Sequence, residues 1–274
     1  MNAAETAVVI VNYRTKELTA EAARSVASEP GVREIVIVDN ASDDGSLPYL
    51  RAELTDVRVR IVESPSNLGF GRGVNLGILH CTAPLVLLLN SDAVLVPGSL
   101  AALARTLTEN EVVAVVAPAV YDAESGNLQA GSHGVFPTLK AIVLRTNHRP
   151  PETISPDWVS GVAMLVRRSD FVTIGGFDPD FHMYLEDVDL CRRFREAGWD
   201  IRRELSAGVL HVRNQSWNSH SFSAALEQAH RSRASFFRKA GYSPMERLAV
   251  EMMRRGHRVL QRTPLRRSFP RKVA

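Results

Sequence analysis

Cysteine is scarce in this chain, and its scarcity excludes several kinds of protein. Only Cys81 and Cys191 occur among 274 residues, far apart and without another cysteine or a histidine at metal-ligand spacing. This pattern excludes a disulfide framework and a structural zinc site, and it is typical of a reducing, cytosolic compartment. With 45% hydrophobic residues, the chain can fold around an ordinary hydrophobic core.

Long hydrophobic runs are missing as well. The longest, Ala83–Leu89, is far shorter than the roughly 20 residues that a membrane-spanning helix needs. The start of the chain, Met1–Thr6, lacks a basic segment followed by an apolar one, so no secretory signal is expected. We therefore expect a cytoplasmic protein.

Acidic residues are nearly absent from the C-terminal end. Residues 230–274 hold 13 Lys and Arg but only 2 Asp and Glu, a balance of +11, whereas residues 1–229 hold 20 and 28, a balance of −8. A basic helical tail with apolar residues can lie on anionic lipid, so peripheral contact with the inner face of the cell membrane is one expectation. A solvated tail is the alternative, and no nucleic-acid partner is expected.

Short runs rich in Val and Ile alternate with helix-like stretches through the first 120 residues. The runs predict strands at Ala7–Val11, Glu34–Val38, Val57–Val62, Leu85–Leu89 and Val112–Ala117. The stretches between the first four runs predict helices at Thr15–Ser28, Ser46–Leu54 and Gly71–His80. This alternation predicts an α/β fold with a mostly parallel, Rossmann-like central sheet flanked by helices.

Beyond residue 120 the pattern changes. Residues 121–157 are rich in Gly, Ser, Asn and Pro and therefore predict a long loop region. Within it we expect a helix at Thr138–Arg145. The elements predicted after it are an apolar run at Val159–Val166, a helix at Glu186–Ala197, short strands at Trp199–Arg203 and Gly208–Val212, and C-terminal helices from Ser221 onward.

Polar residues follow the predicted strands of the first half. In an open parallel sheet such residues gather at the carboxyl ends of the strands, where ligands bind. They include Asn12, Tyr13, Asp39, Asn67, Asn90, Ser91 and Asp92. A carboxylate in the position of Asp39 can accept hydrogen bonds from a ribose or a nucleobase, although the same residue also suits the cap of a turn.

Three glycines, Gly69, Gly71 and Gly73, lie at the start of a predicted helix, where backbone N–H groups can bind an anion. No Gly-Lys-Ser/Thr follows them, and no G-x-G-x-x-G follows the first strand, which excludes a P-loop and a dinucleotide fingerprint. Asp92 is a hard oxygen ligand suited to Mg²⁺ or Mn²⁺, or else a helix cap. His211 is either a metal ligand or a buried partner.

Two adjacent acids, Glu186 and Asp187, begin a predicted helix after the aromatic residues Phe181 and Tyr184. Acids at a helix start are favoured by the helix dipole, and Asp189 is explained by such capping and by pairing with Arg193. Two neighbouring acids after aromatic residues indicate a cleft instead, in which one acid with a raised pKa is a general base.

These stretches, in this order, resemble the family-2 glycosyltransferases of GT-A fold, in particular their bacterial rhamnosyltransferase-like branch. The matching segments are Val9–Tyr13, Val36–Ser46, Asn67–Gly77, Leu89–Asp92, and Gly175–Asp178 followed by Glu186–Leu190. The resemblance covers about residues 7–240. It implies one GT-A domain with a nucleotide-sugar-binding half at 1–120, an acceptor and catalytic half at 121–229, and a basic helical tail at 230–274.

The resemblance also implies roles for single residues. Asp187 would be the general base, with Glu186 beside it positioning the acceptor, and Asp92 and His211 would hold Mg²⁺ or Mn²⁺. Asp92 is the surviving acid of a D-x-D motif that reads Asn90-Ser91-Asp92 here. The residues implied for the nucleotide-sugar are Asn12, Tyr13, Asp39, Asn67, Gly71, Arg72, Asn75, Asn90, Ser91, Trp158 and Gly161.

The function implied is that of a metal-dependent inverting glycosyltransferase. Its donor would be dTDP-rhamnose, and its acceptor a glycan or lipid-linked saccharide of cell-wall or surface-polysaccharide synthesis. A UDP-sugar donor and a catalytically inactive nucleotide-sugar-binding module are the alternatives. A nucleotidyltransferase of similar sheet topology would need a basic, glycine-rich signature near the first strand, and none is visible.

Overall fold

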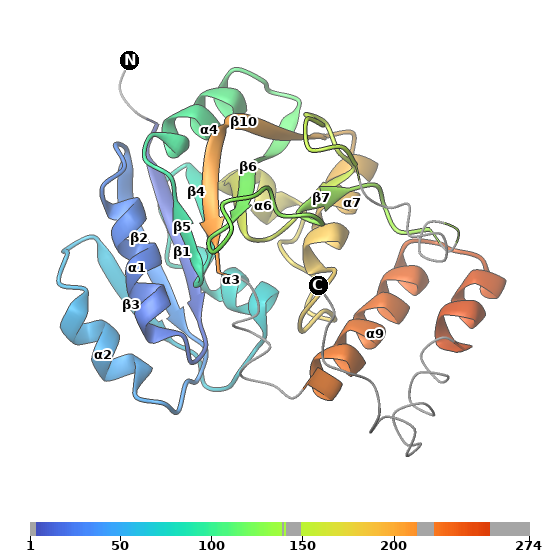
Figure 1. The fold of residues 1–274 in the computed structure, drawn as a ribbon, viewed down its shortest axis with the longest axis horizontal. Helices are drawn as coiled ribbons and strands as arrows, with labels where there is room; N and C mark the ends of the chain where they lie inside the picture. The colour runs from blue at the N-terminus through green and yellow to red at the C-terminus, as the bar shows by residue number, and fades with distance from the viewer. Residues whose placement is uncertain (1–3, 139, 141–148, 213–221, 253–274) are drawn as a thin grey trace.

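The central feature of the computed structural model is an eight-stranded sheet (Figure 1). Residues 4–138, 140, 149–212 and 222–252 are described. The strands are β1 (Thr6–Asn12), β2 (Val32–Asp39), β3 (Val59–Glu63), β4 (Leu85–Asn90), β5 (Ala93–Leu95), β6 (Val113–Asp122), β9 (Ala163–Arg167) and β10 (Asp200–His211), in the order β3-β2-β1-β4-β9-β6-β10-β5. Strands β7 (His133–Gly134) and β8 (Trp158–Val159) form a separate antiparallel pair.

The N-terminal half of the sheet is parallel, as the alternating pattern predicts. Strands β1 to β4 all run in the same direction, and β10 is parallel to β6. Strand β9 runs antiparallel between β4 and β6, and β5 runs antiparallel to β10. One sheet therefore combines strands from before and after residue 120.

Helices cover both faces of the sheet because successive residues of a strand point to opposite sides. Val8 and Ile10 of β1 belong to the core shared with α1 (Lys16–Ala27), α2 (Ser46–Glu53) and α4 (Ser99–Thr108). Val9 and Val11 belong to the core on the other face, shared with α3 (Phe70–Ile78), α6 (Arg168–Thr173) and α7 (Glu186–Glu196).

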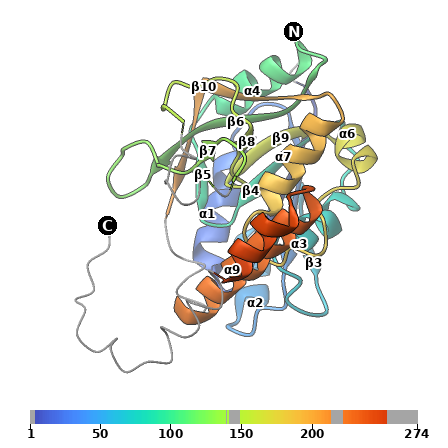
Figure 2. The same cartoon turned by 90° about the vertical axis from the view of Figure 1, so that its right-hand side faces the viewer.

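Helix α9 (Phe222–Lys239) lies beside α7 (Figure 2). Phe236 and Phe237 of α9 pack with Val188 of α7, and Val250 in the helical residues 244–252 completes this small cluster. No helix in the described part of the chain has both the length and the hydrophobicity to cross a membrane.

Some predicted elements differ from the observed ones. Val57 is 99% exposed in the turn before β3, where the backbone N–H of Val59 donates to the carbonyl of Asp56, so this strand begins two residues later than predicted. The two strands predicted at Trp199–Arg203 and Gly208–Val212 form one strand, β10, whose register shifts between Glu204 and Gly208. Most of the helix predicted at Thr138–Arg145, and residues 253–274 of the predicted tail, lie outside the described residues.

Candidate functional site

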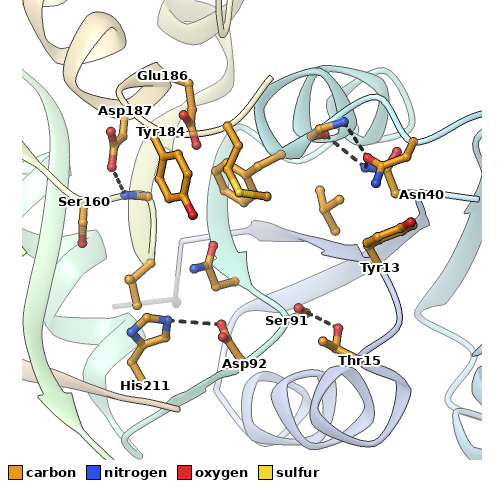
Figure 3. Close-up of a pocket in the computed structure, with 18 of the residues that line it drawn as sticks. Tyr13, Thr15, Asn40, Ser91, Asp92, Ser160, Tyr184, Glu186, Asp187 and His211 are labelled. Atoms are coloured by element: carbon orange, nitrogen blue, oxygen red, sulfur yellow. Dashed lines mark hydrogen bonds and ion pairs between the residues drawn. The ribbon is translucent and has the colours of Figure 1, made fainter. Parts of the chain in front are cut away.

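A cavity of about 370 Å³ lies at the carboxyl ends of β1, β2 and β4. Figure 3 shows its polar groups on three sides. Glu186 and Asp187 lie on one side, Asp92 and His211 lie on the opposite side, and Tyr13 and Asn40 lie on a third. The strand ends therefore converge on one rim, as the sequence predicts.

The structure brings many of the predicted site residues together around this cavity. Those that line the cavity are Tyr13, Asn67, Asn90, Ser91, Asp92, Gly161, Glu186, Asp187 and His211. Those that do not line it are Asn12, Asp39, Gly71, Arg72, Asn75 and Trp158.

Asn12 and Asp39 form a buried hydrogen-bonded pair where β1 and β2 end side by side. The Asn12 Nδ2 donates to Asp39 Oδ1 over 2.7 Å, and the backbone N–H of Ser42 donates to Asp39 Oδ2 over 3.2 Å. The Asn12 Oδ1 accepts from the hydroxyl of Thr19 over 2.8 Å. These bonds hold the Asp39 carboxylate rigidly beside the cavity and leave it further lone pairs.

Other residues predicted to bind the nucleotide-sugar do not line the cavity, and most of them contact other parts of the protein. Asn75 donates to the carbonyl of Phe177 over 2.7 Å and accepts from its backbone N–H over 2.9 Å. A side chain at Gly71 would come within 2.8 Å of Phe177 Cβ, so this glycine permits close packing. The Trp158 Nε1 donates to the carbonyl of Val135, and Arg72 is exposed.

Asp92 and His211 meet because β5 pairs with the end of β10. Ala93 lies opposite His211 in that pairing, which places the preceding Asp92 carboxylate 3.2 Å from His211 Nε2. The other ring nitrogen, Nδ1, lies 2.9 Å from Gln129 Oε1. This hydrogen bond between Nδ1 and the Gln129 amide holds the orientation of the imidazole ring.

The donor set of Asp92 and His211 fits part of a divalent-metal site. A carboxylate oxygen and an imidazole nitrogen lie side by side at the cavity wall. Among the described residues no group of three or more His, Cys, Asp or Glu is placed to hold a metal ion. These two residues therefore suit a cation whose other ligands come from water and a bound phosphate group.

Glu186 and Asp187 begin α7 directly after two non-glycine residues with left-handed backbones, Tyr184 (φ 69°) and Leu185 (φ 66°). The backbone N–H of Gly161 donates to Asp187 Oδ2 over 2.9 Å, and that of Val188 donates to Oδ1 over 2.8 Å. Burial raises the pKa of both carboxyls, and the neighbouring Asp187 charge raises that of Glu186 further. The hydrogen bonds favour the charged form of Asp187, so Glu186 is the acid that keeps its proton.

Three buried polar atoms on the cavity wall have no hydrogen-bond partner among the described residues. They are Ser160 Oγ, Tyr184 Oη and Glu186 Oε2. Buried polar atoms without partners are costly, and in native structures a bound ligand or water commonly satisfies them. Hydroxyl and carboxyl groups on one wall are suited to a ligand with several hydroxyls.

Among the cavity residues that the sequence analysis did not name as candidates are Thr15, Gln129 and Met183. Thr15 donates its hydroxyl to Ser91 Oγ over 2.9 Å, and its place just after a strand end is a signal that points to it. Gln129 lies in the long region without periodicity, where no sequence pattern indicates that it reaches His211.

The fold and site define a class: an α/β protein of GT-A-like fold with a polar cavity at its strand ends. Comparison of the sequence supports this class directly. Residues 7–177 match Glycosyl transferase family 2, and residues 148–214 match the N-terminal domain of galactosyltransferase. Because the first match spans more than half of the chain, the protein belongs to glycosyl transferase family 2.

Two of the relatives with similar sequences are rhamnosyltransferases. An N-acetylglucosaminyl-diphospho-decaprenol L-rhamnosyltransferase of Mycobacterium tuberculosis is 30% identical, over 92% of this chain and 91% of the relative. Rhamnosyltransferase WbbL of Escherichia coli is 28% identical, over 63% of this chain and 65% of the relative. The family therefore includes rhamnosyltransferase relatives of this chain.

A solved structure shares the fold. The mannosyltransferase PcManGT from Pyrobaculum calidifontis, in complex with GDP-Man and Mn²⁺, superimposes with a TM-score of 0.63 at 19% identity, over 90% of this chain and 68% of the other. GalNAc-T7 with UDP, GalNAc and Mn²⁺ gives a TM-score of 0.61 at 16% identity, over 76% and 43%. These similarities show the fold alone.

Proposed function

We propose that the protein is an inverting glycosyltransferase that moves L-rhamnose from dTDP-rhamnose to a hydroxyl of a glycan or lipid-linked saccharide. The reaction would serve cell-wall or surface-polysaccharide synthesis. Support for the sugar and the acceptor comes from the names of the relatives. The observation that carries the proposal is the cavity itself, with the Asp187 carboxylate on one side and Asp92 and His211 on the opposite side.

The donor would bind at the strand ends. Tyr13, Asn67 and the Asn12–Asp39 pair would hold the base and ribose, while Asn90 and Ser91 would lie near the diphosphate. Asp92 and His211 would hold Mg²⁺ or Mn²⁺. When bound, the cation supplies positive charge that stabilises the diphosphate as a leaving group. The unpartnered Ser160 and Tyr184 hydroxyls would satisfy hydroxyls of the bound sugars.

Asp187, across the cavity from Asp92 and His211, would be the general base. Its carboxylate takes the proton of the acceptor hydroxyl, and the acceptor oxygen attacks the anomeric carbon. The bond from that carbon to the nucleoside diphosphate breaks, and the nucleotide leaves with the electron pair. A single displacement from the face opposite the leaving group inverts the anomeric centre. Glu186, carrying a proton, donates a hydrogen bond that positions the acceptor.

The C-terminal end would bring the protein to the inner face of the cell membrane. Met245, Leu248 and Met252 lie one helical turn apart along residues 244–252 and are 80%, 60% and 63% exposed. Residues 253–274 follow with eight Lys and Arg and no acid. Exposed apolar side chains beside a basic segment suit peripheral binding to anionic lipid.

A donor panel tests the proposed reaction. The purified protein is incubated with dTDP-rhamnose or a UDP-sugar, with and without a saccharide acceptor, and nucleoside diphosphate release is measured. We expect acceptor-dependent release from dTDP-rhamnose that stops on chelation and returns with Mn²⁺ or Mg²⁺. Release from the UDP-sugar alone contradicts the donor assignment, activity after chelation contradicts the metal assignment, and binding without any release indicates an inactive module.

A further inference from the structure

A second cavity, of about 220 Å³, adjoins the catalytic cavity, and Gln129 lines both. Its described lining includes Arg149, Arg203 and His133, but no Asp or Glu. The function proposed above uses none of these three residues. A cavity with two guanidinium groups and without an acid in its described lining is electrostatically suited to an anion.

Arg203 is the unusual residue of this second cavity. It lies on β10 and is only 3% exposed. Its Nη1 donates to the carbonyl oxygens of Pro151 (2.6 Å) and Thr153 (3.0 Å), and burial lowers its pKa. Within the described part of the chain it forms no ion pair, whereas Arg192 and Arg193 both pair with Asp189.

A buried guanidinium without a counter-charge is energetically costly. Carbonyl oxygens satisfy some of its N–H donors, but they do not neutralise its charge. A phosphate group supplies the missing charge and matches the planar donor geometry of arginine. Arg149, which is exposed on the same cavity, provides a second cation for the same group.

The second cavity lies beside the cavity in which we place the transfer reaction. Residues 129–132 separate the two cavities: Gln129 contacts His211 on the catalytic side, and the carbonyl of Ser132 accepts from the backbone N–H of Ser160 over 2.8 Å. Ser160 and Gly161 lie next to Asp187. The second cavity is therefore a direct neighbour of the first, with Gln129 and the segment 129–132 shared between their walls.

We propose that the cavity at Arg203 and Arg149 binds a phosphate group of the acceptor, so that the acceptor is a saccharide joined to its carrier through phosphate. This inference rests on the proposed transferase function and adds an acceptor subsite to it. The source of the phosphate is the acceptor, because the donor diphosphate is assigned to Asp92 and His211 in the first cavity.

Anion binding is tested first, without turnover. Calorimetry measures the affinity of the full-length protein for pyrophosphate in the presence of a chelator, which removes metal-bridged binding at Asp92 and His211. We expect Arg149→Gln and Arg203→Lys to weaken binding at least tenfold, whereas Arg202→Gln, next along β10, leaves it unchanged. Equal affinities in all four proteins overturn the anion site. Arg149→Gln changes an exposed residue, so the test does not depend on the folding of an Arg203 variant.

Transfer kinetics then identify the source of the phosphate. With a diphosphate-linked saccharide as acceptor, Arg149→Gln should raise the acceptor KM at least tenfold while kcat and the donor KM stay unchanged. With the same saccharide lacking phosphate, wild type and variant should have equal KM values. A raised donor KM, or an equal effect on both acceptors, overturns the acceptor assignment. Absence of transfer by wild type, with pyrophosphate binding still dependent on Arg149, contradicts the proposed function and leaves the anion site in place.

Discussion

At the scale of single residues, the two adjacent acids at the start of α7 differ in their hydrogen bonds. Asp187 accepts from two backbone N–H groups, whereas Glu186 Oε2 has no partner among the described residues. Adjacent acids after aromatic residues were enough to predict a cleft from the sequence. The residue pattern alone did not distinguish the two acids, and only the family resemblance singled out Asp187, because the N–H of Gly161 that bonds to it comes from a turn 26 residues away.

This difference predicts a pH dependence for transfer. Because burial raises the pKa of Asp187, its base form is lost as pH falls through that raised value, above the pH of about 3.9 at which an exposed aspartate titrates. Glu186→Gln keeps a neutral side chain, so we expect its rate to stay within about tenfold of wild type, with the acidic limb unmoved. The pH profile of kcat/KM measures both, and complete loss of activity in Glu186→Gln would show that Glu186 is the base.

At the scale of elements, the sequence predicted the parallel strands and the rim where they end, because short Val- and Ile-rich runs alternate regularly with helices. The pairing of β5 with β10 was not predictable. It joins Asp92 to a histidine more than one hundred residues later, and β5 has only three residues. The position of Gln129 beside His211, and the cavity at Arg203, also depend on contacts between residues far apart in the sequence. Residues 121–157 contain no periodic pattern that would indicate these contacts.

The loop before α3 offers a test of how the cavity wall is built. A side chain at Gly69 (φ +83°) would lie 2.0 Å from the carbonyl oxygen of His182, and Gly69 lines the cavity. At Gly126 (φ +70°) a side chain meets nothing within 4 Å. Denaturant unfolding should show that Gly126→Ala costs about 1 kcal/mol of backbone strain, and that Gly69→Ala costs about 3 kcal/mol because the clash adds to the strain. Equal losses would mean that the close approach of His182 does not constrain this wall.

At the scale of the whole molecule, charge divides the chain. Its first 229 residues carry a balance of −8, and several of their acids, among them Asp39, Asp92, Glu186 and Asp187, lie at or beside the catalytic cavity. The remaining residues carry +11. The overall value of +3 is the sum of an acidic part, which contains the cavity, and a basic end, for which we propose contact with anionic lipid.

This division predicts binding to anionic vesicles. A chain ending at Met252 keeps Val250 in its core cluster and loses eight Lys and Arg. In sedimentation with anionic vesicles, the full chain should pellet and the shortened chain should stay in solution, since each basic residue near the surface contributes about 1 kcal/mol. High salt or neutral vesicles should release the full chain. Equal pelleting of both chains contradicts a role for residues 253–274.

The most direct test of sugar transfer at this cavity replaces the proposed base. Single-turnover transfer to the acceptor and binding of the donor are measured in wild type, in Asp187→Asn, and in Glu196→Gln, which changes an exposed acid on the same helix. We expect Asp187→Asn to lose at least about a hundredfold in transfer rate while binding the donor normally, and Glu196→Gln to match wild type. Transfer by Asp187→Asn at a near wild-type rate would contradict the account.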